Sequence, residues 1–351
     1  MNIIKGKLLF DALQKHFELV CPMLKKPVGM RKYHANSVYE KIESQFLKYA
    51  GQPSQEIFGL FSLKFKEILI GEPAELQNII FQVDRILKTR RLTFKEFDAS
   101  TPPRLVHTQL YKDIVHCFNY EAYTSNEYAY HILPLVNVNA CPYCNRQFIN
   151  TYSDNKGKTR AQLDHFYNQS KYPYLAISFY NLIPSCYSCN SSLKKSAKFS
   201  IQTHVHPYLN SFENILRFTI NYKKQPNTLK YIAEFYANSA FLEIGLEPCV
   251  SKLNGEYIKA KNNTDCFRLT QLYNLHKDLI IELLQKEVIY EKSGYATLLK
   301  NKYPKLFNDE NDIFRLLLGN YYYEKDFNKR PFSRLIRDIS LELKLSNKML
   351  A

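Results

Sequence analysis

The chain has 351 residues, of which 45% are hydrophobic and 14% aromatic, so it can bury a core, which argues against wholesale disorder. Lysine and arginine number 48 against 33 acidic residues, a net charge of +15, which favours nucleic acid over anionic membrane as a polyanionic partner. No stretch approaches the roughly 20 apolar residues of a membrane span, and residues 1–17 lack a signal-peptide core, so we expect a soluble, cytoplasmic protein with no membrane partner.

Residues 1–138 have a mainly helical pattern. It is clearest in residues 71–91, where Pro73 suits a first helical turn and apolar residues recur on one face. That face consists of Leu76, Ile79, Ile80, Val83, Ile86 and Leu87. The sequence DASTPPRL at 98–105 then breaks the chain before a second amphipathic run at 110–118. We therefore predict a helical N-terminal region over 1–138.

The central part of the chain changes to short strands, turns and paired cysteines. Two C-x-x-C pairs predict one tetrahedral structural zinc site, because a two-residue gap lets both sulfurs of a pair turn toward one ion. The predicted ligands are Cys141, Cys144, Cys186 and Cys189. The other four cysteines are scattered singly, and we expect them to be buried free thiols. They are Cys21, Cys117, Cys249 and Cys266.

Residues 211–351 begin with strand-like patterns and return to helix. RFTINYK at 217–223 alternates like a strand, and NGEYIKAK at 254–261 looks like half of a hairpin. Residues 268–290 show helical periodicity, and residues 331–345 predict a last helix. The sequence contains no internal repeat and no long flexible linker. We therefore expect the central unit to be embedded between helical flanks.

Three motifs lie between or beside the cysteine pairs: LDHF at 163–166, YNLIPSC at 180–186 and CNSSLKK at 189–195. In this order they resemble the zinc-stapled branch of the HNH endonucleases, the His-Me finger nucleases whose site is two short strands followed by a helix. The resemblance implies an α+β fold. A small ββα-metal core with the four-cysteine zinc site, residues 139–210, would lie between largely α-helical regions 1–138 and 211–351.

The resemblance also implies a role for each site residue. His165 would be the general base that takes a proton from the attacking water, since an imidazole titrates near neutral pH. Asp164 and Asn190 would hold one divalent ion, Mg²⁺ or Mn²⁺, through oxygen ligands. Asn181 would tie down the loop that carries His165. Asn190 stands where the family has the histidine of its last letter, and it keeps an oxygen for a hard ion.

Basic residues gather around these motifs. Between Cys141 and Asn210 eight basic residues face two acidic ones, and we expect some of them to contact phosphates. The candidates are Lys194, Lys195, Lys198 and Arg160. His204 and His206 also lie nearby, where loop hydrogen bonding is a simpler role than a second metal site. Asp164 and His165 are adjacent and so point to opposite faces of a regular strand, which lets both reach one phosphate only where the strand ends or bulges.

The implied activity is metal-dependent hydrolysis of phosphodiester bonds, with DNA ahead of RNA as substrate. CPYCNRQFI and KYPYLAISFYNLIPSC, with the helical extensions, resemble the bacterial HNH proteins found beside an ATPase in Septu-type anti-phage defence systems, which implies an ATPase partner. Two alternatives stay open. One is an RNA-cleaving HNH nuclease with Tyr167, Tyr172 and Tyr174 stacking on bases. The other is a zinc-dependent nucleic-acid-binding protein without cleavage activity.

Overall fold

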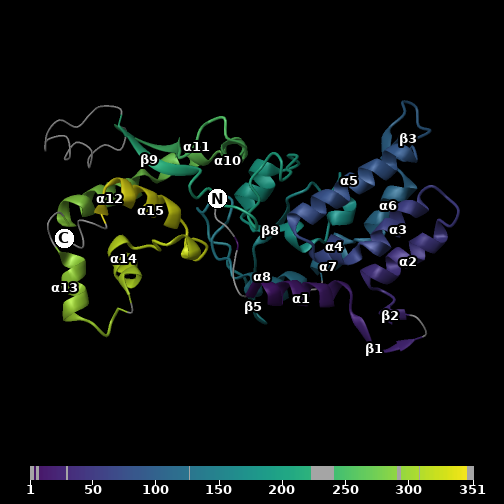
Figure 1. Ribbon diagram of the computed structural model, residues 1–351, viewed down its shortest axis with the longest axis horizontal. Coiled ribbons are helices and arrows are strands. Elements are labelled where there is room, and N and C mark those ends of the chain that lie inside the picture. Colours follow the sequence, from purple (N-terminus) through teal and green to yellow (C-terminus); the bar gives the residue numbers. More distant parts are fainter. Residues whose placement is uncertain are drawn as a thin grey trace.

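The computed structural model describes residues 4, 8–28, 31–125, 127–222, 241–290, 294–307 and 309–345. Over these residues the protein is a mixed α+β structure, mostly helical, with small two-stranded sheets. Helices from the first third of the chain lie at one end of the molecule and the C-terminal helices at the other, with β8 between them (Figure 1). Among the described helices, none combines the length and apolar character needed to cross a membrane.

The N-terminal region is helical, as predicted, and adds two β-hairpins, β1–β2 and β3–β4. Its elements are α1 (Leu8–Val20), β1 (Met23–Val28), β2 (Arg31–Tyr33), α2 (Val38–Lys48), α3 (Gln55–Leu63), α4 (Phe65–Ile70), α5 (Pro73–Thr89), β3 (Lys95–Phe97), β4 (Leu105–His107), α6 (Gln109–Cys117), α7 (Tyr120–Ser125) and α8 (Tyr128–Val136). The helix predicted around residues 71–91 is confirmed as α5. It begins at Pro73, and the Glu75 carboxylate accepts a hydrogen bond from the Glu72 backbone N–H at 2.7 Å.

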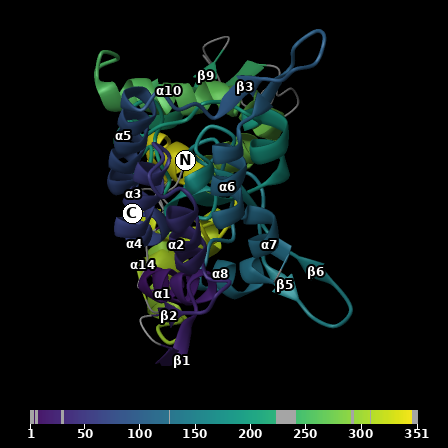
Figure 2. The same ribbon diagram turned by 90° about the vertical axis from the view of Figure 1, so that its right-hand side faces the viewer.

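The central region contains two short sheets and three short helical turns. Its elements are β5 (Tyr152–Ser153), β6 (Lys158–Thr159), β7 (Gln162–His165), η1 (Pro173–Leu175), η2 (Phe179–Asn181), β8 (Leu182–Ser185) and η3 (Ser188–Lys194). Strands β7 and β8 pair antiparallel, with Asp164 opposite Ile183 and His165 opposite Leu182. The β5–β6 hairpin projects from the body of the molecule (Figure 2).

The C-terminal region starts with one two-stranded antiparallel sheet, formed by β9 and β10, and continues as helices. Its elements are β9 (Leu216–Tyr222), β10 (Leu242–Pro248), α10 (Gly255–Cys266), α11 (Leu269–Tyr273), η5 (Asn274–His276), α12 (Lys277–Tyr290), α13 (Tyr295–Lys302), α14 (Glu310–Leu318), η6 (Glu324–Asp326) and α15 (Ser333–Glu342). The strand predicted at 217–223 is confirmed as β9, apart from Lys223, which lies outside the described residues. The last predicted helix is confirmed as α15, which packs on β9.

Two predictions are wrong. Residues 254–261 are not half of a hairpin, because β9 pairs with β10 and Asn254 instead starts helix α10. The Asn254 side chain accepts a hydrogen bond from the Glu256 backbone N–H at 2.8 Å, which is the usual task of asparagine at a helix start. Among the scattered cysteines, Cys21 and Cys117 are buried as expected, whereas Cys249 is exposed and Cys266 is only partly buried.

Candidate functional site

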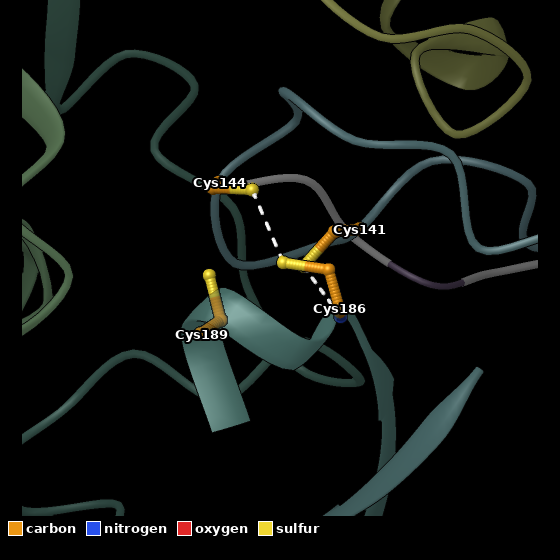
Figure 3. Close-up of side chains that lie close together, drawn as sticks. All are labelled: Cys141, Cys144, Cys186 and Cys189. Atoms are coloured by element: carbon orange, nitrogen blue, oxygen red, sulfur yellow. Dashed lines mark hydrogen bonds between the residues drawn. The ribbon is translucent and has the colours of Figure 1, made fainter. Parts of the chain in front are cut away.

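The four paired cysteines come together in one buried cluster, as predicted (Figure 3). Their sulfur atoms all lie within 4.8 Å of one another, and the sulfurs of Cys144 and Cys186 are 3.9 Å apart. Zinc–sulfur bonds of about 2.3 Å in a tetrahedron separate neighbouring sulfurs by about 3.8 Å. The donor type, number and spacing therefore suit a structural zinc ion.

The surroundings of the cluster favour thiolates that share a cation. Burial raises the pKa of the Cys141 thiol, whereas hydrogen bonding with Cys141 and the other cysteines of the cluster lowers the pKa of Cys186. Two backbone N–H groups also point at sulfur, from Cys186 to Cys141 and from Arg146 to Cys144, each at 3.4 Å. A bound cation takes the place of the thiol protons, and these N–H groups then stabilise the thiolates.

The residue that follows the first cysteine pair, Asn145, forms hydrogen bonds to the C-terminal region. Asn145, next to Cys144, has a left-handed backbone with φ of 48° and is buried. Its side-chain N–H group donates to the Phe327 carbonyl at 2.9 Å, and its side-chain oxygen accepts from the Arg334 N–H at 3.2 Å. The Asn145 carbonyl accepts from the Phe332 N–H at 2.6 Å. The loop that carries Cys141 and Cys144 and the start of α15 are thus one hydrogen-bonded unit.

Strand β7 presents the Asp–His pair on its two faces, as the alternation of a strand requires. The Asp164 side chain is buried, with Tyr143 and Lys194 as its hydrogen-bond donors. The His165 ring lies on the other side, against Tyr120, with ring centroids 4.5 Å apart and the rings near perpendicular. The structure therefore separates the two side chains that the resemblance assigns to one reaction centre.

The hydrogen bond of His165 fixes which ring nitrogen can act as a base. Its Nε2 lies 2.8 Å from the Ala176 carbonyl oxygen. Because a carbonyl only accepts, Nε2 carries the proton and Nδ1 holds the free lone pair of the neutral ring. Burial lowers the pKa of His165, which keeps the ring neutral at neutral pH. His165 stays partly exposed, so a water molecule can reach this face of β7.

Asn181 lies where the resemblance expects a loop tie. It is fully buried, and its side-chain oxygen accepts from the Tyr167 N–H at 2.6 Å. Its side-chain N–H groups donate to the carbonyls of Tyr167 at 3.3 Å and Leu175 at 2.8 Å. The Leu175 carbonyl immediately precedes that of Ala176, the partner of His165. Asn181 therefore positions the acceptor that orients the imidazole.

Asp164 was expected to bind a divalent ion and Lys194 to contact phosphate, but the structure pairs the two side chains with each other. Their side chains are 3% and 2% exposed, and the Lys194 Nζ lies 2.9 Å from Asp164 Oδ1. The second carboxylate oxygen, Oδ2, accepts from the Tyr143 hydroxyl at 2.6 Å. Lys194 is thus a buried ion-pair partner in this structure and is not placed to contact phosphate. The physical reason is that a buried carboxylate requires a nearby positive charge.

The expected divalent-ion ligands do not form an open site as folded. Asn190 is partly exposed, and its side-chain N–H group donates to Gln162 Oε1 at 3.0 Å. Gln162 is two residues from Asp164 on β7, so Asn190 lies on the Asp164 side of the strand. However, both Asp164 oxygens are already bonded. This donor set does not fit Mg²⁺ or Mn²⁺ while Lys194 is paired with Asp164.

The other predicted phosphate contacts are accessible. Lys195 and Lys198 are exposed just beyond η3. Arg160 is partly exposed and close enough to Tyr120 to lower the pKa of that phenol, against the larger raising effect of burial. Tyr120 therefore has both the His165 ring and the Arg160 guanidinium in its surroundings.

The remaining candidates have packing roles. His206 is buried, its Nδ1 accepts from the Tyr208 N–H at 3.3 Å, and burial lowers its pKa to about 3. His204 stacks on Phe199, with ring centroids 3.6 Å apart. Tyr167 and Tyr174 are fully buried under the loop, so they are not available to stack on bases.

Two contributors to the site were missed from the sequence. Tyr143 lies between the first two cysteines and reaches Asp164, and Tyr120 on α7 covers His165. The position of Tyr143 inside the C-x-x-C pair was the only available signal for it. Tyr120 had none, since it is distant in sequence from every motif.

Comparisons of this chain with protein-family models, curated proteins and solved structures give no significant match.

Proposed function

We propose that this protein is a zinc-stapled HNH-type endonuclease that hydrolyses phosphodiester bonds in DNA, with His165 as the general base. The observation that carries the proposal is the hydrogen bond from His165 Nε2 to the Ala176 carbonyl. It leaves Nδ1 as a proton acceptor on a partly exposed strand end. The neighbouring β8, η3 and four-cysteine cluster follow the order of the family motifs.

In this proposal the imidazole and nearby cations carry the chemistry that the structure supports. His165 Nδ1 takes a proton from water as its oxygen attacks phosphorus. The bond from phosphorus to the 3′ oxygen breaks, and the 3′ oxygen takes up a proton from solvent. Arg160, Lys195 and Lys198 are accessible to flanking phosphates. The resemblance adds Mg²⁺ or Mn²⁺ to neutralise developing charge, but the paired Asp164 does not offer that ion a free oxygen.

The direct test is cleavage of supercoiled plasmid by the purified, zinc-loaded full chain over a range of Mg²⁺ and Mn²⁺ concentrations. His165→Ala removes the base, and we expect cleavage to fall by about 10²–10⁴-fold. His131→Ala, on the exposed side of α8, is the matched control and should cleave like the wild type. Cleavage by His165→Ala at the wild-type rate would refute the role of His165.

The buried Asp164–Lys194 pair supports a second candidate, a zinc-dependent nucleic-acid-binding protein that does not cleave. Binding of plasmid or single-stranded RNA in a gel-shift assay, with no cleavage at any metal concentration, would favour it. An RNA arm in the cleavage assay tests the RNA-nuclease alternative. Of the three tyrosines in the stacking argument for RNA, Tyr167 and Tyr174 are buried, which weakens it, whereas Tyr172 is partly exposed.

The motifs that resemble Septu-type HNH proteins support a narrower proposal, in which the protein acts in anti-phage defence with an ATPase partner. The helical regions on either side of the site offer the surface for such a partner (Figure 1). Plasmid cleavage that requires the ATPase subunit and ATP would support it.

A further inference from the structure

The Lys194 ammonium occupies a position built like a hard-cation site. It donates to Asp164 Oδ1 at 2.9 Å and to the His165 backbone carbonyl at 2.5 Å. Carboxylate and carbonyl oxygens are also the ligands that Mg²⁺ and related ions take in proteins. The Phe199 ring, 4.9 Å from Nζ, adds a further surface that favours a cation. A divalent ion and this ammonium would therefore use the same oxygens.

Among the described residues, Lys194 is the one cation that pairs with the Asp164 carboxylate. The Tyr143 hydroxyl that bonds Oδ2 is neutral. A carboxylate that is 3% exposed is strongly destabilised without a compensating charge. If the Lys194 ammonium is removed, another cation bound at the same oxygens would therefore stabilise the Asp164 carboxylate.

We propose that Lys194 is a built-in competitor of divalent cations at Asp164, so that a metal ion binds there only by displacing the lysine side chain. The proposal rests on the proposed function in one respect, since it treats Asp164 as the ion's ligand. It explains why the expected donor set is closed in the structure while Asn190, on the same side of β7, stays partly exposed.

The position of Lys194 at the end of η3 allows its side chain to be displaced without a large change in the backbone. Lys194 is the last residue of η3, and Lys195 then takes a positive φ of 48° and is exposed. The helix thus ends at the lysine, and the chain beyond it turns toward solvent. Withdrawal requires rotation of a four-carbon side chain. It leaves β7, β8 and the cysteine cluster in place.

The test measures Mn²⁺ binding to the zinc-loaded full chain without nucleic acid, by calorimetry and by the Mn²⁺-dependent shift in thermal unfolding. Zinc keeps the thiolates occupied, since manganese is the weaker ion for such ligands. We expect Lys194→Met to bind one Mn²⁺ at least about tenfold more tightly than the wild type, because the competing charge is gone. Lys195→Met removes a neighbouring exposed charge and should bind like the wild type.

A double variant assigns the binding to Asp164. Asp164→Asn combined with Lys194→Met removes both charges and should lose the added Mn²⁺ affinity. If Lys194→Met does not fold in metal-free buffer, Mn²⁺ should restore its folding, whereas the double variant should fold without Mn²⁺. Equal Mn²⁺ affinity of Lys194→Met and wild type, undiminished affinity of the double variant, or an unfolded Lys194→Met that Mn²⁺ does not rescue would each overturn the proposal.

The outcome is separable from that of the cleavage assay. Tight Mn²⁺ binding by Lys194→Met, with no plasmid cleavage by any variant of the isolated chain, would support the competition and reject an autonomous DNA nuclease. Cleavage by the wild type, with no change in the Mn²⁺ affinity of Lys194→Met, would support the nuclease and reject the competition.

Discussion

His165 is the residue whose chemistry depends most directly on its surroundings. Burial lowers its pKa from the ordinary 6.5, and the hydrogen bond to the Ala176 carbonyl opposes this with a smaller effect. A general base works in its neutral form, which predominates above its pKa. A lowered pKa therefore moves the acid limb of the rate profile to lower pH.

We predict that the rate of DNA cleavage rises with pH and levels off with an apparent pKa below 6.5. Tyr120→Ala uncovers the His165 ring to water and should move that pKa upward, since less burial favours the charged imidazole. NMR titration of His165 in the full chain provides the same pKa without substrate. A wild-type pKa at or above 6.5, unchanged by Tyr120→Ala, contradicts this account.

At the scale of the element, the loop between β7 and β8 depends on one side chain. Asn181 satisfies the backbone N–H and carbonyl of Tyr167 and the carbonyl of Leu175. Asn181→Ala would leave these three groups without their partner in a buried site. Such groups cost about 1–3 kcal/mol each, so the loop is a weak point of the fold once the amide is lost.

We predict that Asn181→Ala lowers the free energy of unfolding by about 3 kcal/mol or more, measured by urea denaturation. Asn190→Ala is the matched control. Its amide bonds only the Gln162 side chain at a partly exposed site, and its loss should cost less than about 1 kcal/mol. Similar costs for the two variants would show that the Asn181 bonds do not hold the loop.

The helices and the cysteine cluster could be predicted because their signals are local. Helix α5 shows a continuous apolar face and a proline start, and C-x-x-C spacing points both sulfurs one way. Helix α10 was missed because its buried residues, Ala260 and Asn263, give almost no apolar periodicity. Asn263 can be buried because its side-chain amide forms hydrogen bonds with both the N–H and the carbonyl of Val205.

The pairing of Asp164 with Lys194 could not be predicted from spacing. The two residues are 30 positions apart, and the lysine reaches β7 from the end of a π-helical turn, whose register differs from that of an α-helix. Lys194 and its neighbour Lys195 are the same residue type, yet one is buried and the other exposed. Only the three-dimensional packing of η3 on β7 distinguishes them.

At the scale of the whole molecule, the loop that carries Cys141 and Cys144 forms hydrogen bonds to β7 and to the C-terminal region. Tyr143 reaches Asp164 on β7, the Cys144 carbonyl accepts from the Tyr273 hydroxyl at 2.6 Å, and Asn145 bonds the segment before α15. The C-terminal helices therefore depend on a loop whose shape a metal ion in the cysteine cluster would maintain.

We predict that Cys186→Ser, or removal of zinc by a chelator, raises amide hydrogen exchange at Phe332 and Arg334 by at least about tenfold. Both N–H groups donate to Asn145, and they lose this acceptor when the loop opens. Cys249→Ser, at an exposed thiol, is the control and should leave exchange unchanged. Full protection of both amides in the zinc-free protein would show that the loop holds its shape without metal.

The bonds of Asn145 also set an order of assembly during synthesis. Cys189, the last of the four cysteines, leaves the ribosome 138 positions ahead of Phe327, an interval on the order of ten seconds at ordinary translation rates. Zinc can bind in that interval, before the polar groups of Asn145 have their partners. Zinc bound at this stage would shape the segment around Asn145 before its C-terminal partners emerge.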